Sequence, residues 1–225
     1  MALQSAIVDL DGTMVDTLGD FVVALNATLA DLRLRSVGRA FVAETIGRGS
    51  EHLLRTTLAE VDADAALYGD AWARYQDHYR AINGEYANVF DGVEEGLQWL
   101  GAQGLSLACL TNKPTAFAQA LLARKGLGRH FRLVWGGDAF ERRKPDPLPL
   151  LKACEAFGTP PSATLVVGDS SNDASAARAA GCPVVLVTYG YNHGEPVREV
   201  DADAWIDSLG AIGPVLRAPG KRGAA

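Results

Sequence analysis

Polar side chains follow directly after several short apolar segments of this 225-residue chain. Each of these segments has the length and composition of a buried β-strand. The carboxyl ends of parallel strands meet at one edge of a sheet, and open sheets bind their ligands there. The side chains in these positions are Asp9 and Asp11, then Thr111, Asn112 and Lys113, then Asp138 and Lys144, and finally Asp169, Ser170, Ser171, Asn172 and Asp173.

Four carboxylates of this set are expected to share one crevice, namely those of Asp9, Asp11, Asp169 and Asp173. Like charges at about 4 Å repel by about 4 kcal/mol per pair at an effective dielectric constant of about 20, so a cation is needed to hold them together. An oxygen-only ligand set without nearby His or Cys selects a hard cation, and Mg²⁺ fits this preference. Lys144 adds a further positive charge.

The turn formed by residues 111–113 is suited to binding a phosphate group. Thr111 offers a hydroxyl, and the backbone N–H groups of the turn lie close to the start of a predicted helix, where anions bind. Together with a hard cation and a lysine, this turn predicts metal-assisted phosphoryl transfer.

Asp9 and Asp11 are spaced so that they can divide the work of such a reaction. Residues i and i+2 of an extended segment point to the same side, so both carboxylates can face one phosphorus atom. One of them can attack and form an aspartyl-phosphate. The other can donate a proton to the leaving oxygen and later accept one from the hydrolytic water. Gly12 allows a sharp turn after them, and Thr13 can tether it.

The hydrophobic periodicity of the chain predicts an α/β fold. Short apolar segments alternate with amphipathic helices from residue 84 onward, which indicates a doubly wound parallel sheet, a Rossmann-like core with helices on both faces. Predicted strands span residues 5–8, 105–110, 133–135, 164–167, 184–187 and, as a weak edge strand, 204–206. Predicted helices of this core span residues 115–125, 147–157, 172–180 and 208–216, and Val93, Leu97 and Leu100 mark one more helix face.

One predicted strand precedes a long helical stretch, and all the others follow it. Apolar residues recur at three- and four-residue spacing from Leu18 to Leu29, and no convincing strand falls between Asp16 and Ile82. Further helices are predicted at residues 41–46, 51–58 and 70–82. We therefore expect two domains, an α/β core of residues 1–15 and 84–225 and an inserted helical cap of residues 16–83.

Four motifs, in order and each after a predicted strand, resemble those of the haloacid dehalogenase superfamily in its phosphatase branch. They are Asp9-Leu-Asp-Gly-Thr13, Thr111, Lys144, and Gly168-Asp169 with Asp173. The resemblance runs from Ala6 to about Asn192. Four local segments are similar to phosphoglycolate phosphatases, as is a helical cap inserted after the first motif. These segments are Thr111-Asn-Lys-Pro114, Lys144-Pro-Asp-Pro147, Gly168-Asp-Ser-Ser-Asn-Asp173 and Tyr189-Gly-Tyr-Asn192.

The resemblance implies a role for each motif carboxylate. Asp9 would be the nucleophile and a Mg²⁺ ligand, and Asp11 would be the general acid and base, with its backbone carbonyl on the metal. Asp169 would bind Mg²⁺. Asp173 would hold a metal-bound water or orient its neighbours. The alternative interpretation is that Asp173 only caps the following helix.

The resemblance also implies how the phosphate is held. Thr111 and the amide of Asn112 would bind the phosphoryl oxygens, and Lys144 would neutralise charge on Asp9 and on the phosphate. Superfamily members that act as dehalogenases lack the second aspartate, so Asp11 argues against that chemistry.

Three further features have two open interpretations each. Arg48, in the flexible turn Gly47-Arg48-Gly49, can meet a substrate carboxylate bidentately, or it is a solvated residue of an ordinary helix–helix turn. The resemblance places a substrate-specificity loop near this turn. Lys113 belongs either to the site or to the charged surface, and the segment Tyr189–Asn192 either reaches the site or only packs its aromatic rings.

The sequence therefore predicts a Mg²⁺-dependent phosphomonoesterase for a small phosphorylated metabolite, with 2-phosphoglycolate as the leading candidate. Alternatives on the same site are a pyrophosphatase, a sugar or nucleotide phosphatase, and a phosphosugar mutase. Phosphonate hydrolysis in this superfamily uses a cap lysine, and residues 16–88 contain none. A non-catalytic binding module should have lost a motif carboxylate or the lysine, and all are present.

Composition narrows the class of partner. A formal net charge of -6 without a basic run argues against nucleic acid and anionic membranes. No segment approaches the roughly 18 apolar residues of a membrane span, and no signal peptide is expected at the start. The widely spaced Cys109, Cys154 and Cys182 indicate a reduced compartment, so we expect a cytoplasmic protein. Whether it is a monomer or a homodimer is left open.

Overall fold

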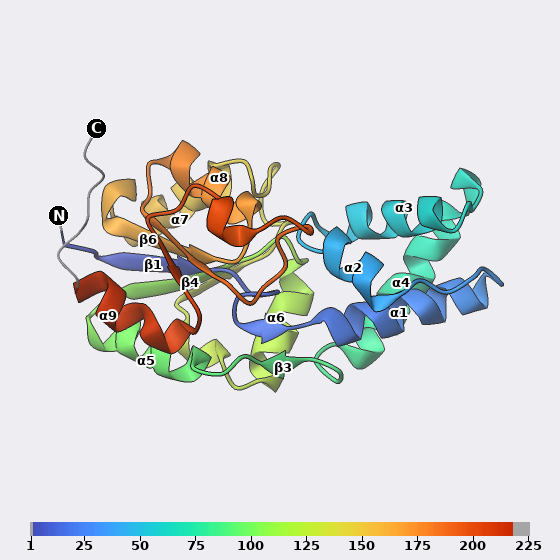
Figure 1. The fold of residues 1–225 in the computed structure, drawn as a ribbon, viewed down its shortest axis with the longest axis horizontal. Helices are drawn as coiled ribbons and strands as arrows, with labels where there is room; N and C mark the ends of the chain where they lie inside the picture. Colours follow the sequence, from blue (N-terminus) through green and yellow to red (C-terminus); the bar gives the residue numbers. More distant parts are fainter. Residues whose placement is uncertain (1, 218–225) are drawn as a thin grey trace.

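The computed structural model describes residues 2–217 and centres on a six-stranded parallel β-sheet (Figure 1). Its strands are β1 (Ser5–Val8), β4 (Ser106–Leu110), β5 (Leu133–Trp135), β6 (Thr164–Gly168), β7 (Val184–Val187) and β8 (Ala204–Ile206). They lie in the order β5-β4-β1-β6-β7-β8, so the chain starts in the middle of the sheet and winds outward in both directions. The predicted doubly wound sheet is confirmed, and the predicted edge strand lies at an edge.

Five helices flank the sheet, namely α5 (Val93–Ala102), α6 (Thr115–Arg124), α7 (Leu148–Phe157), α8 (Ser171–Ala180) and α9 (Ile212–Arg217). Successive side chains of a strand point to opposite faces of the sheet. Because the strands are apolar on both faces, helices cover both. Val8 packs into one hydrophobic cluster with Leu97 and Leu121, whereas its neighbour Ile7 packs into another with Leu150. Figure 1 shows α5, α6 and α9 below the sheet and α7 and α8 above it.

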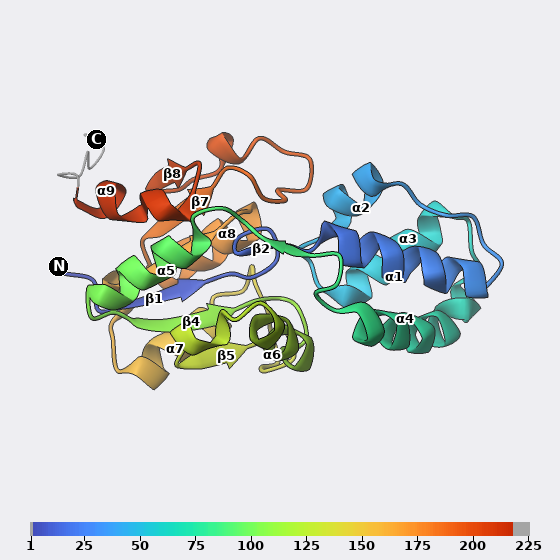
Figure 2. The same ribbon diagram turned by 90° about the horizontal axis from the view of Figure 1, so that it is seen from below.

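Four more helices lie beyond the carboxyl ends of the strands (Figures 1 and 2). They are α1 (Leu18–Asp31), α2 (Arg39–Thr45), α3 (Ser50–Glu60) and α4 (Tyr68–Ile82). They pack around a hydrophobic cluster of their own, which includes Leu25, Leu54, Tyr75 and Tyr79. We call these four helices the cap. They stand over the edge of the sheet that carries the polar residues, while the domain boundaries after residues 15 and 83 remain a prediction.

A two-stranded antiparallel sheet joins the segments that lead into and out of the cap. It pairs β2 (Val15–Asp16) with β3 (Asn88–Val89), with Val15 opposite Val89. The sequence did not predict this pair, because strands of two residues are too short to show an alternating pattern.

Smaller differences concern the ends of elements. The predicted helix 208–216 begins as a 3₁₀ turn at Leu209–Ala211 and continues as α9. Four other 3₁₀ turns lie at Ala65–Leu67, Gly128–His130, Pro161–Ala163 and Val197–Glu199. The last residues of the predicted core, 218–225, lie outside the described part of the chain.

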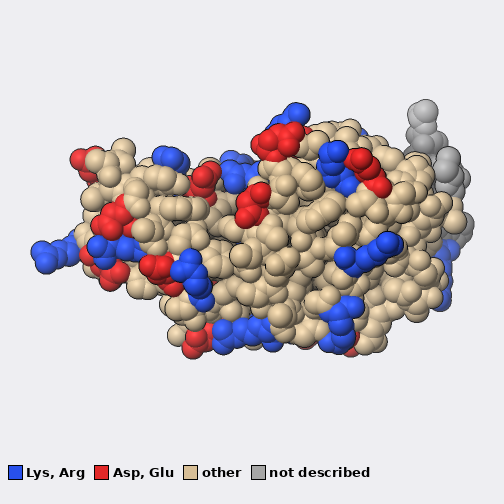
Figure 3. Space-filling model, turned by 180° about the vertical axis from the view of Figure 1, so that it is seen from behind, with Lys and Arg blue, Asp and Glu red and all other residues tan. Residues whose placement is uncertain are grey.

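The outer surface carries charges of both signs. Figure 3 shows Lys and Arg interspersed with Asp and Glu on one face of the molecule. Exposed ion pairs occur on the surface, such as Arg178 with Asp201 at 3.0 Å. None of the helices among residues 2–217 combines the length and the apolar composition that crossing a bilayer requires.

Asp20 of α1 binds the segment that leads from the end of α4 back to the sheet. The side chain is fully buried and accepts hydrogen bonds from the backbone N–H groups of Gly84 at 2.6 Å and Tyr86 at 2.7 Å. Asp20→Ala would remove the acceptor of both N–H groups, of which that of Gly84 is buried, so we expect it to lower the free energy of unfolding by about 2–4 kcal/mol. Urea denaturation measures this. The exposed Asp77→Ala should change it by less than about 0.5 kcal/mol, and equal losses would contradict the tether.

Candidate functional site

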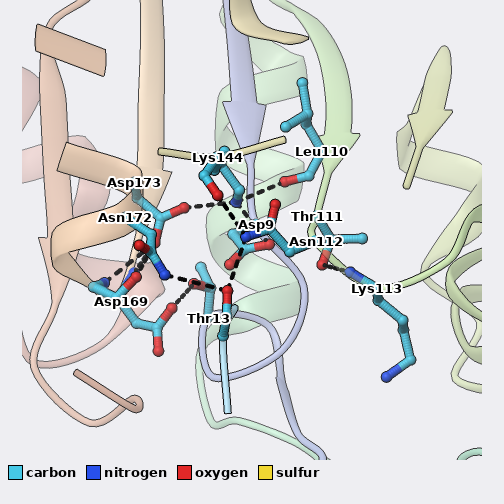
Figure 4. A network of polar contacts seen from close by, with 12 residues as sticks. Asp9, Thr13, Leu110, Thr111, Asn112, Lys113, Lys144, Asp169, Asn172 and Asp173 are labelled. Carbon is cyan, nitrogen blue, oxygen red and sulfur yellow. Dashed lines mark hydrogen bonds and ion pairs between the residues drawn. The ribbon is translucent and has the colours of Figure 1, made fainter. Parts of the chain in front are cut away.

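Most of the predicted site residues line one cleft between the sheet and the cap, and Lys144, Asp173 and Arg48 are the exceptions. Its core side is lined by Asp9, Asp11, Thr111, Asn112, Lys113, Asp169, Ser170 and Tyr191. Its cap side is lined by Phe21, Ile46, Gly47, Gly49, Ser50 and Leu53. Figure 4 shows Asp9, Thr111 and Asp169 converging from the ends of separate strands.

Sheet register explains why these residues meet. β1 lies between β4 and β6, and Val8 is paired with Cys109 on one side and with Val167 on the other. The three strands therefore end side by side at the same edge of the sheet. The residues that follow them are neighbours, which brings Asp9 and Asp169 together.

Asp9 is a buried carboxylate with a raised pKa. Its backbone N–H donates to the carbonyl of Val167 at 2.9 Å, and Lys144 Nζ lies 3.0 Å from its Oδ1. Burial raises the pKa of Asp9 to about 7, against the attraction of Lys144 and with a further increase from Asp173. Such a group is more costly to ionise in the metal-free protein than an ordinary aspartate.

Three carboxylates form a cluster that fits a hard cation. Oxygen atoms of Asp9, Asp169 and Asp173 lie within 4.8 Å of one another, and Asp169 and Asp173 are almost completely buried. Burial, Asp173 and Asp9 all raise the pKa of Asp169 well above its usual range. One lysine cannot balance three carboxylates, whereas a divalent cation with oxygen ligands would. The donor set therefore fits Mg²⁺, with Asp9 and Asp169 as the predicted side-chain ligands.

Lys144 lies at the centre of this cluster (Figure 4). Its Nζ donates to Asp173 Oδ1 at 2.6 Å and to the carbonyl of Leu110 at 2.9 Å, and it also contacts Asp9. Burial alone would lower the pKa of Lys144, but the two carboxylates outweigh burial and raise the pKa above its ordinary value. The residue is therefore a permanent cation, which agrees with the charge-neutralising role implied by the resemblance.

Asp173 both caps a helix and orients its neighbours. Its Oδ2 accepts hydrogen bonds from Ser170 Oγ at 2.8 Å and from the backbone N–H groups of Ser170 at 3.2 Å and Asp169 at 3.3 Å. Its Oδ1 accepts from Lys144. Capping of the helix and orientation of a neighbour are thus compatible, because Oδ2 binds the start of the helix while Oδ1 binds Lys144.

A hydrogen bond and close packing hold the turn after β1 against Asp169. Thr13 Oγ1 donates to Asp169 Oδ1 at 3.0 Å, as a tethering role for Thr13 requires. Gly12 has φ +81°, and a Cβ there would lie 2.2 Å from Asp169 Oδ2. Only glycine fits both the left-handed backbone and this close approach.

Thr111 and Asn112 follow β4 at the edge of the cleft. Both are buried, and the Thr111 N–H donates to the carbonyl of Trp135. Asn112 Nδ2 donates to the carbonyls of Gly47 at 2.8 Å and Lys144 at 2.9 Å. The side chain of Asn112 thus ties the cap to the core, a function that the sequence did not reveal.

Lys113 is buried in the site and is not a surface charge. Its Nζ donates to Asp11 Oδ1 at 2.9 Å and to Asp11 Oδ2 at 3.2 Å. The ammonium also lies 4.6 Å from the ring centroid of Phe21 and 4.7 Å from that of Tyr79. The Asp11 carboxylate therefore faces Lys113 and the cap, apart from the carboxylate cluster around Lys144.

Arg48 is exposed on the loop between α2 and α3. Its neighbours Gly47 and Gly49 line the cleft, whereas Arg48 does not. The contact of Arg48 with a substrate carboxylate remains a prediction.

Tyr189 and Tyr191 reach the site from the loop after β7. Tyr189 Oη donates to the carbonyl of Thr13 at 2.8 Å, and the Tyr191 N–H donates to Asp169 Oδ2 at 2.6 Å. Tyr191 Oη also donates to Asp16 at the entrance to the cap. The aromatic residues in the sequence indicated that this loop could reach the site, but they did not predict which residues it contacts.

Comparisons with known proteins agree with this geometry. A family model described as haloacid dehalogenase-like hydrolase matches residues 6–187. A phosphoglycolate phosphatase of Thiobacillus denitrificans is 45% identical over 212 residues, covering 93% of each chain. The protein named phosphoglycolate phosphatase, plasmid, of Cupriavidus necator is 43% identical, covering 96% of this chain and 94% of its own. The crystal structure of a predicted phosphoglycolate phosphatase from Haemophilus somnus superposes with a TM-score of 0.92 at 31% identity, covering 96% and 98%.

Proposed function

The chain belongs to the haloacid dehalogenase-like hydrolase family, and we propose that it hydrolyses 2-phosphoglycolate with Mg²⁺ through an aspartyl-phosphate. It is a phosphoric monoester hydrolase, like its named relatives. The observation that carries the mechanism is the buried carboxylate of Asp9, which lies beside Lys144 in a cluster with two more carboxylates.

Asp9 is the nucleophile of the first displacement. A carboxylate oxygen of Asp9 forms a bond to phosphorus, and the bond from phosphorus to the ester oxygen breaks. Lys144 balances part of the negative charge on Asp9, and the hydroxyl of Thr111 holds a phosphoryl oxygen. Asp9, Asp169 and the backbone carbonyl of Asp11 would hold Mg²⁺, which would supply Lewis-acid stabilisation of the phosphoryl charge.

Asp11 moves the proton in both displacements. It first donates a proton to the leaving ester oxygen, which releases glycolate. It then accepts a proton from water as the water oxygen attacks phosphorus, which releases phosphate and restores the Asp9 carboxylate. The cap over the cleft excludes bulk water from the first step.

The substrate is the finer part of this proposal. It is supported by the names of the relatives and by a cleft whose cap side is lined by Phe21, Ile46 and Leu53, with Ser50 as a polar group. Such a lining suits a small organic group.

A substrate panel tests the proposal. Phosphate release with Mg²⁺ should give the highest kcat/KM for 2-phosphoglycolate among small phosphomonoesters, pyrophosphate, sugar phosphates and nucleoside monophosphates. A chelator should abolish release from all of them. A sugar phosphate or nucleotide ranking far above 2-phosphoglycolate would reject the substrate, and full activity with chelator would reject the metal.

A further inference from the structure

We propose that Lys113 is a specificity-determining residue that binds the carboxylate of the substrate. The assignment rests on the proposed function and names the residue that distinguishes 2-phosphoglycolate from a phosphomonoester without a carboxylate. It concerns a residue on the core side of the cleft whose ammonium faces the aromatic rings of the cap.

The position of Lys113 is that of a built anion site. Its side chain is only 2% exposed, and its ammonium lies near the rings of Phe21 and Tyr79. Aromatic faces attract a cation without neutralising it, so the ammonium still needs an anion. Figure 4 shows the side chain extending away from the cluster of Asp9 and Lys144, so its charge is not used there.

Asp11 occupies this anion position in the structure. Both of its carboxylate oxygens accept hydrogen bonds from Lys113 Nζ. To donate a proton to the ester oxygen, the Asp11 carboxyl must face that oxygen and leave this bidentate contact. A buried ammonium without a partner is costly, so a second anion is then required next to Lys113. The carboxylate of 2-phosphoglycolate is such an anion.

The remaining lining of the cleft offers no competing cation. Among the lining residues, all within residues 2–217, Lys113 is the only one with a positive charge. The cap contributes apolar side chains, glycine backbone and the hydroxyl of Ser50 to this lining. Arg48, the predicted partner of a substrate carboxylate, is exposed and does not line it. A carboxylate in the closed cleft therefore meets Lys113.

Two esters that differ only at the carboxylate separate its recognition from catalysis. Ethyl phosphate matches 2-phosphoglycolate but carries a methyl group in place of the carboxylate. With Mg²⁺, the wild type should show a kcat/KM ratio between them of about 10- to 100-fold in favour of 2-phosphoglycolate, the range for hydrogen bonds to a charged partner. Lys113→Met and Lys113→Gln should bring this ratio to within about threefold. Lys152→Met, an exposed lysine on α7, should keep the wild-type ratio.

The ratio distinguishes recognition from a structural role of Lys113. A variant that merely disturbs Asp11 or the cap would lower kcat/KM for both esters equally and leave the ratio unchanged, and that result would overturn the assignment while the proposed function stands. Hydrolysis of neither ester by the wild type would reject the proposed function and the assignment with it.

Binding of non-hydrolysable analogues gives a second measurement that needs no folded variant. In 3-phosphonopropionate a methylene replaces the ester oxygen of 2-phosphoglycolate, and propylphosphonate is the counterpart with a methyl group in place of the carboxylate. Calorimetry with the wild type and Mg²⁺ should show binding of 3-phosphonopropionate about 10-fold tighter or more. Equal affinities would overturn the assignment, and loss of the difference in Lys113→Met would support it.

Discussion

Asp9→Asn should lower kcat for 2-phosphoglycolate by about 10⁴-fold or more, the scale seen when a catalytic nucleophile is removed. Asparagine is nearly isosteric with aspartate, but its amide is a far weaker nucleophile at phosphorus, so no aspartyl-phosphate forms. Single-turnover phosphate release with Mg²⁺ measures the loss. Asp77→Asn, at an exposed position of α4, should keep the wild-type rate. Activity of Asp9→Asn within tenfold of the wild type would exclude Asp9 as the nucleophile.

The stability of this variant shows whether its fold is intact. Burial raises the pKa of Asp9 to about 7, well above the usual range of an aspartate, so this group stabilises the metal-free protein at low pH. That contribution is lost as the pH rises from about 4 to about 7. Because Asn does not titrate, Asp9→Asn should gain stability relative to the wild type between about pH 5 and about pH 8 in chelator. A relative loss over this range would contradict the raised pKa.

Mg²⁺ should stabilise the wild type, and Asp169→Asn should remove most of this effect. A ligand at about 100 times its Kd raises the free energy of unfolding by about 2.7 kcal/mol. The effect should be large here because a divalent cation relieves the repulsion among the clustered carboxylates of Asp9, Asp169 and Asp173. Thermal unfolding with and without Mg²⁺ measures it independently of activity.

Asp138→Asn is the matched control for the metal. Asp138 follows β5 at the same edge of the sheet, but its Oδ1 accepts hydrogen bonds from Thr115, outside the carboxylate cluster. The Mg²⁺ shift of this variant should equal that of the wild type. An equal shift in Asp169→Asn would show that Asp169 is not a ligand, and a wild type without any shift would argue against a metal at this cluster.

The sequence by itself was sufficient for the sheet and for the convergence of its polar ends. A strand such as Ser5–Val8 is apolar at every position because both of its faces are buried, and that pattern is local. Since parallel strands end at one edge, the types of Asp9, Thr111 and Asp169 and their positions after strands were enough to place them together. The helical cap could also be predicted, because amphipathic periodicity is a property of neighbouring residues.

Only the tertiary structure decided which partner each polar group takes. Lys113 follows the same strand as Thr111. The direction of its side chain, however, depends on the rings of Phe21 and Tyr79, which belong to two cap helices far from Lys113 in the sequence. Asn112 reaches Gly47, and Tyr191 reaches Asp169, through contacts between residues far apart in the chain. Side-chain spacing within a segment carries no information about such contacts, because they depend on how the cap and the loops pack against the sheet.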